Sequence, residues 1–123
     1  MRSRDVYRYI EKRQRQLYLD EWGLRVQTVQ ADVLDDGTIG RAYEVEPNGP
    51  YASIDIACKL PDDKVKTSCT HEVCHVRLFD MCLVVERALQ RLGEAEAQAF
   101  RDAYEQAEER AVVAFTGVIE GAE

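Results

Sequence analysis

The sequence predicts one α+β domain spanning residues 1–123, with an N-terminal helix, a three-stranded antiparallel sheet, a helix that carries a histidine motif, and a long C-terminal helix. Two patterns lead to this prediction. Apolar residues recur at helical spacing at both ends of the chain, and apolar and polar residues alternate between them. Strands that are grouped together, rather than interleaved with helices, are typical of the α+β class.

The N-terminal segment is predicted to form an amphipathic helix over residues 4–20. Val6, Ile10 and Leu17 fall near helical spacing, and arginine, lysine and glutamine residues lie between them. The Asp-Glu-Trp-Gly segment at 20–23 ends this helix.

Three strands are expected next, over residues 24–30, 39–45 and 51–57. The first and third alternate apolar with polar residues, which is typical of half-buried strands. Turn-forming residues follow the first two strands, with Asp-Asp-Gly at 35–37 and Pro-Asn-Gly-Pro at 47–50. Because short turns usually join neighbouring strands, we predict an antiparallel meander.

The remainder of the chain is predicted to be helical. Asp62 or Asp63 is expected to cap a helix that runs from residue 62 toward residue 92. Gly93 ends it, and an alanine-rich helix with an apolar stripe follows over residues 94–119.

Composition and charge narrow the class of protein. The 123 residues are 46% hydrophobic and 32% charged, as in soluble globular domains. No apolar run could cross a bilayer and the N-terminus has no signal core, so we expect a cytoplasmic location and no membrane partner. The formal charge of −7 argues against nucleic acid as a partner. The four cysteines are Cys58, Cys69, Cys74 and Cys82. No Cys-x-x-Cys pair occurs among them, so we predict no disulfide framework.

A His-Glu-x-x-His motif stands in the first of the two C-terminal helices. His71 and His75 are the two histidines of the chain, and on a helix their four-residue spacing places them on one face. One Zn²⁺ ion could bind both imidazoles, while Glu72 on the adjoining face accepts a proton from the activated water. The surrounding residues are apolar, and buried histidines need partners, which a shared metal would provide.

A catalytic zinc site needs three protein ligands and one open position, so a third ligand must come from elsewhere in the chain. Glu86 is excluded unless the helix breaks first, since a continuous helix would place it about 16 Å along the axis from His75. The acidic cluster of Glu105, Glu108 and Glu109 on the last helix is the better source. A helical wheel puts Glu108 within the apolar stripe and Glu109 at its edge, and the choice between them stays open.

Other interpretations remain from the residues alone. Cys69 and Cys74 could join the histidines in a structural zinc site, but four ligands from two turns of one helix all lie on one side of a metal. Cys74 is therefore expected to be a small buried residue. The chain could also be a non-catalytic, zinc-stabilised binding or regulatory module, or a metal-free interaction protein.

The chain resembles small zincin-like metallopeptidases of the phage and prophage type, which are related to the ImmA/IrrE family. The resemblance covers the leading helix, the entry into the first strand at 22–26, the strand at 51–56 and the motif at 70–76. Residues 108–115 are similar to the family's glutamate segment, in which a zinc-binding glutamate is followed by apolar residues three and six positions further on.

The resemblance implies a minimal zincin-like metallopeptidase domain. Its zinc ligands would be His71, His75 and Glu109, which fits the glutamate segment best, with Glu108 as the alternative third ligand. Glu72 would be the general base in hydrolysis of a protein or peptide substrate. Relatives cleave repressors, so a regulatory endopeptidase is implied as well.

Unlike larger relatives, the chain has no further histidine that could stabilise a tetrahedral intermediate. Tyr51, Tyr104 and Arg110 are the candidates for that role.

Overall fold

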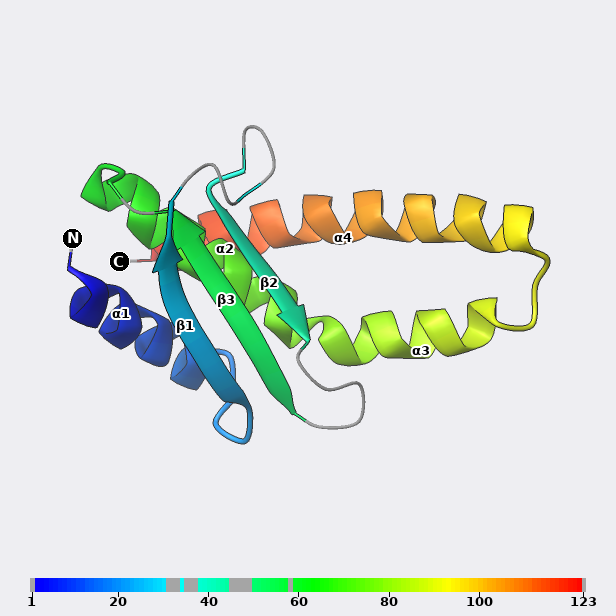
Figure 1. The fold of residues 1–123 in the computed structure, drawn as a ribbon, viewed down its shortest axis with the longest axis horizontal. Coiled ribbons are helices and arrows are strands. Elements are labelled where there is room, and N and C mark those ends of the chain that lie inside the picture. The colour runs from blue at the N-terminus through cyan, green and yellow to red at the C-terminus, as the bar shows by residue number, and fades with distance from the viewer. Residues whose placement is uncertain (1, 31–33, 35–37, 45–49, 58, 123) are drawn as a thin grey trace.

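The computed structural model describes residues 2–30, 34, 38–44, 50–57 and 59–122. These residues confirm the α+β class, with four helices and a three-stranded sheet. The turn predicted at 35–37, most of that at 47–50, and Cys58 lie outside the described residues. The elements in chain order are α1 Ser3–Gln16, β1 Gly23–Val29, β2 Gly40–Glu44, β3 Tyr51–Ala57, α2 Asp62–Arg77, α3 Phe79–Leu89 and α4 Glu94–Gly121 (Figure 1).

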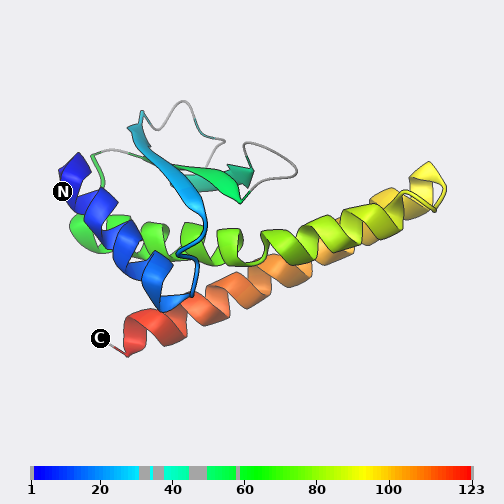
Figure 2. The same cartoon turned by 90° about the horizontal axis from the view of Figure 1, so that it is seen from below.

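The elements form three layers. The sheet lies on one side of α2, and α4 packs against the other side of α2 (Figure 2). α1 lies beside α2 under β1, while α3 and α4 form an antiparallel hairpin that projects beyond the sheet (Figures 1 and 2). α2 is therefore the central element of the domain, and whatever it carries can meet both the sheet and α4.

The sheet is mixed, so the predicted antiparallel meander is wrong. The strand order is β1-β3-β2, with β3 parallel to β1 and antiparallel to β2. β3 is the strand whose residues from Ala52 to Ala57 are all buried, and a strand buried on both faces is stabilised most in the centre. β1 and β2 carry more polar side chains and occupy the edges.

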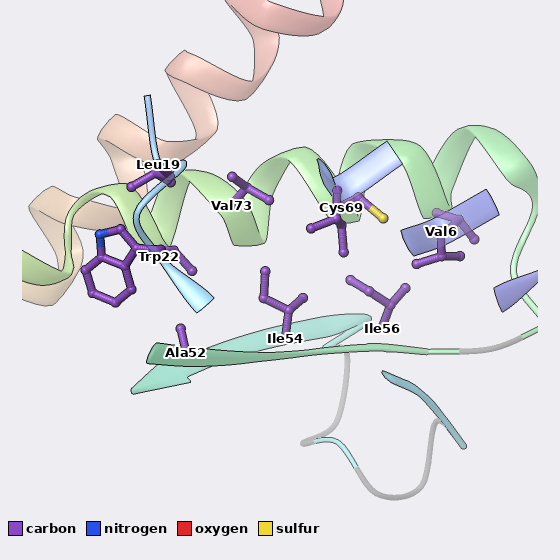
Figure 3. Close-up of a cluster of buried hydrophobic side chains, with 11 residues drawn as sticks. Val6, Leu19, Trp22, Ala52, Ile54, Ile56, Cys69 and Val73 are labelled. Atoms are coloured by element: carbon purple, nitrogen blue, oxygen red, sulfur yellow. The ribbon is translucent and has the colours of Figure 1, made fainter. Parts of the chain in front are cut away.

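The hydrophobic core lies between the sheet and α2. Ala52, Ile54 and Ile56 alternate along β3 and point toward α2, where Cys69 and Val73 face them (Figure 3). All five side chains are at most 1% exposed. The remaining buried members of this core come from α1, the α1–β1 connection and α2: Val6, Ile10, Leu19, Trp22, Val65 and Val76.

Several helix ends differ from the prediction. α1 ends at Gln16 because Tyr18 takes a left-handed φ of 56° and the chain then turns Leu19 into the core. The N-cap of α2 is Pro61, so Asp62 and Asp63 lie in the first turn, where their charges favour the helix dipole.

The helix expected to run from residue 62 toward residue 92 breaks at Leu78, which separates α2 from α3. Phe79 turns toward Trp22, with ring centroids 6.0 Å apart, and this tertiary contact accounts for a bend at a position with no proline or glycine.

A buried polar network joins three helices and holds the C-terminal end of α4. The Arg13 side chain on α1 is fully buried and pairs with Glu120 on α4 at 3.0 Å. Arg13 Nε also donates to Thr70 Oγ1 on α2 at 2.9 Å, and that hydroxyl donates to Glu120 at 2.6 Å. The Tyr9 hydroxyl donates to the same carboxylate at 2.9 Å. The network fixes α4 against α2 next to the histidine motif.

Candidate metal centre

The two histidines of the motif project from one face of α2. His71 and His75 are half-buried, their ring centroids are 5.0 Å apart, and their Nε2 atoms are 3.3 Å apart. This spacing follows from one helical turn between the residues. The two Nε2 atoms, each able to bind a metal, are thus held close together on the side of α2 that faces α4.

Glu109 on α4 completes the group. Its Oε1 lies 2.9 Å from His71 Nε2 and its Oε2 lies 3.0 Å from His75 Nε2. The ligand atoms of the three side chains all lie within 4.8 Å of one another, and together they could hold a metal ion. The side chain of Glu109 is 52% exposed, so the group stands at the protein surface and solvent can reach it.

Glu108 occupies a different position from Glu109. It is mostly buried, as the helical wheel indicated, and its Oε1 lies 3.7 Å from the other ring nitrogen of His75, Nδ1. A carboxylate near Nδ1 favours the tautomer that keeps Nε2 unprotonated and so available to a metal. The structure brings Glu109 to the Nε2 atoms and leaves Glu108 behind the His75 ring.

Glu72 lies on the adjoining face of α2 and is only 5% exposed. Burial raises its pKa to about 8, and the charge of Glu109 adds to this effect. Without a cation nearby, Glu72 is therefore largely protonated at neutral pH. Burial lowers the pKa of His71, which keeps that imidazole neutral and able to bind a metal.

A cleft of about 560 Å³ opens over the three motif residues. One wall is α2 with Glu109, and the other is the segment Thr38–Ala42 at the start of the edge strand β2. β2 approaches α2 closely because Gly40 has no side chain. A Cβ there would lie 2.5 Å from Ser68 Oγ and 3.2 Å from Glu72 Cγ. Gly40 thus sets the width of the cleft at Glu72.

Sequence reasoning missed the role of Gly40 and of Ser68, which also lines the cleft. A glycine at the start of a strand is a known mark of close backbone approach. Gly40 is visible in the sequence, but nothing in the sequence shows which helix packs against this strand.

The structure places the other sequence candidates away from this cleft. Glu86 pairs with Arg101 on α4, with an Nε–Oε1 distance of 2.7 Å. Cys74 is 2% exposed and is not part of the ligand group. The three side chains considered for oxyanion stabilisation are not among the described residues that line the cleft: Tyr51, Tyr104 and Arg110.

No protein-family model matches the chain, and neither the curated proteins nor the solved structures give a significant match. Within the described part of the chain, no helix is both long and apolar enough to span a membrane.

Proposed function

We propose that this protein is a zinc-dependent peptidase of the zincin-like class, as its resemblance to the ImmA/IrrE-related enzymes implies. The observation that carries the proposal is the convergence of His71, His75 and Glu109 beside the buried Glu72. Ligand atoms at about 2.0–2.1 Å from a tetrahedral zinc ion lie about 3.3 Å apart. The Nε2 atoms of the two histidines are 3.3 Å apart, which fits this geometry without rearrangement of α2.

Two histidines and one glutamate are a known ligand set of catalytic zinc, and they leave a fourth position open. Bound there, zinc would supply a Lewis acid and lower the pKa of a water molecule toward neutrality. A cation would also lower the pKa of Glu72, so that this carboxylate could accept a proton in the cleft and pass it to the leaving amine.

The proposed substrate is an extended peptide. β2 is an edge strand of the sheet and its first residues form one wall of the cleft. A peptide that pairs with this edge would gain main-chain hydrogen bonds and would lie with a carbonyl near the ligand group.

The three glutamates of α4 allow a matched test of the metal centre. Metal content and zinc affinity are measured for purified wild type and for Glu105→Gln, Glu108→Gln and Glu109→Gln. We expect about one zinc per chain in wild type, loss of most of it in Glu109→Gln, and a 10–100-fold weaker affinity in Glu108→Gln. The exposed control Glu105→Gln should bind like wild type. Equal affinity in all four proteins would refute the ligand assignment.

A second candidate is a non-catalytic, zinc-stabilised binding module of the same fold. It is favoured by one observation: apart from the two proposed ligands His71 and His75, the described cleft residues include no histidine, tyrosine or lysine. Arg41 is the one cationic side chain among them, and its Nε is paired with Asp55 at 2.7 Å.

Glu72→Gln separates the two functions. In a peptidase it abolishes cleavage of a peptide library while zinc content stays at the wild-type level. A wild-type protein that holds zinc but cleaves nothing in the same assay would instead establish the binding module.

A further inference from the structure

β1 forms the edge of the sheet that lies away from the metal cleft, and its outer side is open. Gly23 N donates to Pro50 O at 2.8 Å, so the odd-numbered residues of β1 pair with β3 in the parallel register. The main-chain groups of successive strand residues point to opposite sides, so Leu24, Val26 and Thr28 direct their N–H and C=O groups away from β3. Among the described residues, no backbone group bonds to them there.

A groove of about 430 Å³ follows this edge, between β1 and α1. α1 lies alongside β1 and runs in the opposite direction (Figure 1), with the hydroxyl oxygens of Ser3 and Thr28 3.3 Å apart. Three consecutive β1 residues line the groove although their side chains alternate between the two faces of the sheet. The groove therefore reaches the strand edge itself, where main chain is accessible. Its lining includes Arg4, Arg8 and Glu11 on α1 and Val26, Gln27 and Thr28 on β1.

The α1 wall of the groove is basic at one end. α1 carries five basic and two acidic residues, in a chain whose formal charge is −7. Arg4 and Arg8 are exposed, and within the part of the chain that the structure describes neither forms an ion pair. Their four-residue spacing places them about 5–6 Å apart on one helix face, and Glu11 lies one turn further along that face. The groove is thus positive near Thr28 and negative toward its other end.

We propose that this groove binds an extended acidic segment of a partner protein, which joins the sheet as a new strand beside β1. Such a strand would make main-chain hydrogen bonds to Leu24, Val26 and Thr28. Side chains on one face of a strand recur about every 6.6–6.8 Å, so two acidic residues two positions apart can face Arg4 and Arg8 together. The position opposite Glu11 takes a neutral or basic side chain. This site does not depend on the proposed zinc chemistry.

Charge selects this occupant over a second copy of the chain. A twofold pairing of two β1 edges would place both α1 helices on the same side of the joined sheet, with the arginines of both copies along one seam. Like charges there repel each other, whereas an acidic strand is attracted. The three residues that would pair have neither proline nor a charged side chain, which are the usual protections of an exposed strand edge.

The test is an NMR titration of isotope-labelled protein with two short peptides, one of alternating valine and glutamate and one of alternating valine and glutamine. Mass spectrometry checks that the peptides stay intact. The glutamate peptide should shift the amide signals of Leu24, Val26 and Thr28. It should bind about 2–30-fold more tightly than the glutamine peptide, as expected for two exposed ion pairs.

Charge variants test the role of the α1 wall. The double variant Arg4→Gln, Arg8→Gln should lose the preference for the glutamate peptide. The matched control Arg87→Gln, Arg91→Gln removes two exposed arginines of the same spacing from α3 and should keep it. Glu11→Gln removes the opposing charge and should tighten binding of the glutamate peptide by up to about 5-fold.

Thr28→Pro tests the strand pairing. Proline there removes an N–H at the free edge but no hydrogen bond to β3, so it should abolish binding while circular dichroism stays that of wild type. If this variant misfolds, the charge variants still decide.

Four results would overturn the proposal. They are no binding of the glutamate peptide up to about 1 mM, equal affinity for the two peptides, shifts confined to the cleft wall Thr38–Ala42, and a wild type that pairs with itself through β1. Binding of a single-stranded oligonucleotide at Arg4 and Arg8, with neither peptide bound, would overturn it as well.

Discussion

Gly40 offers a direct test of how the cleft is built. Its φ is outside the left-handed region, so alanine is permitted by the backbone and the cost of Gly40→Ala is steric. The new Cβ would meet Ser68 Oγ at 2.5 Å, Glu72 Cγ at 3.2 Å and the Asp55 carbonyl oxygen at 3.3 Å. The Asp55 oxygen belongs to the central strand and cannot withdraw, so β2 must move away from α2.

The expected change in the free energy of unfolding follows from two opposing effects. Overpacking of this kind costs about 1–3 kcal/mol, and the loss of glycine freedom in the unfolded chain returns roughly 0.4–1 kcal/mol. Gly40→Ala should therefore lower the free energy of unfolding by about 1–2 kcal/mol, measured by urea denaturation. The proposed peptidase turnover should also fall more than the zinc affinity, because the cleft wall formed by β2 moves away from Glu72 while the proposed ligands on α2 and α4 stay in place.

A double-mutant cycle identifies the clash. Ser68 Oγ donates only a long hydrogen bond of 3.4 Å to Ile39 O, so Ser68→Ala alone should cost little. Combined with Gly40→Ala it removes the closest contact and should restore about 0.5 kcal/mol or more. Strictly additive effects in the cycle would refute the claim that β2 and α2 meet at this point.

Two further predictions concern buried charges. In metal-free protein, the raised pKa of Glu72 means that the folded state holds its proton between pH 4.5 and about 8, so stability falls as pH rises through this range. Glu72→Gln should not lose stability over this pH range. It should be more stable than wild type at pH 9 by up to roughly 4 kcal/mol, with little difference at pH 4. Equal differences at both pH values would contradict this prediction. Glu120→Gln removes the carboxylate charge that lies 3.0 Å from the buried Arg13 guanidinium and should cost roughly 3 kcal/mol in thermal unfolding. Its control, Glu86→Gln at the part-exposed pair with Arg101, should cost under about 1 kcal/mol, and a reversed order would contradict the importance of burial.

Only part of the candidate metal centre can be predicted from local sequence pattern. His71 and His75 are four residues apart on one helix, so their convergence is a property of helical geometry and is readable from the chain. The helical wheel also predicted correctly that Glu108 is more buried than Glu109. Burial and convergence are different properties, however: the more exposed carboxylate is the one that lies at the two Nε2 atoms.

The sequence by itself determined the elements whose pattern is local. The alternation at 51–57 and the helical spacing from residue 62 onward each yielded an observed element. The tertiary structure decided what depends on contacts between distant residues. It placed β3 between β1 and β2, since burial on both faces selects the central strand. It bent the chain at Leu78, where Phe79 turns toward Trp22. It brought Glu109 to the histidines, because α4 is held against α2 by a network that includes Arg13, more than a hundred residues before Glu120. Helical and strand periodicities arise within a few residues, whereas these contacts exist only after the whole chain has packed.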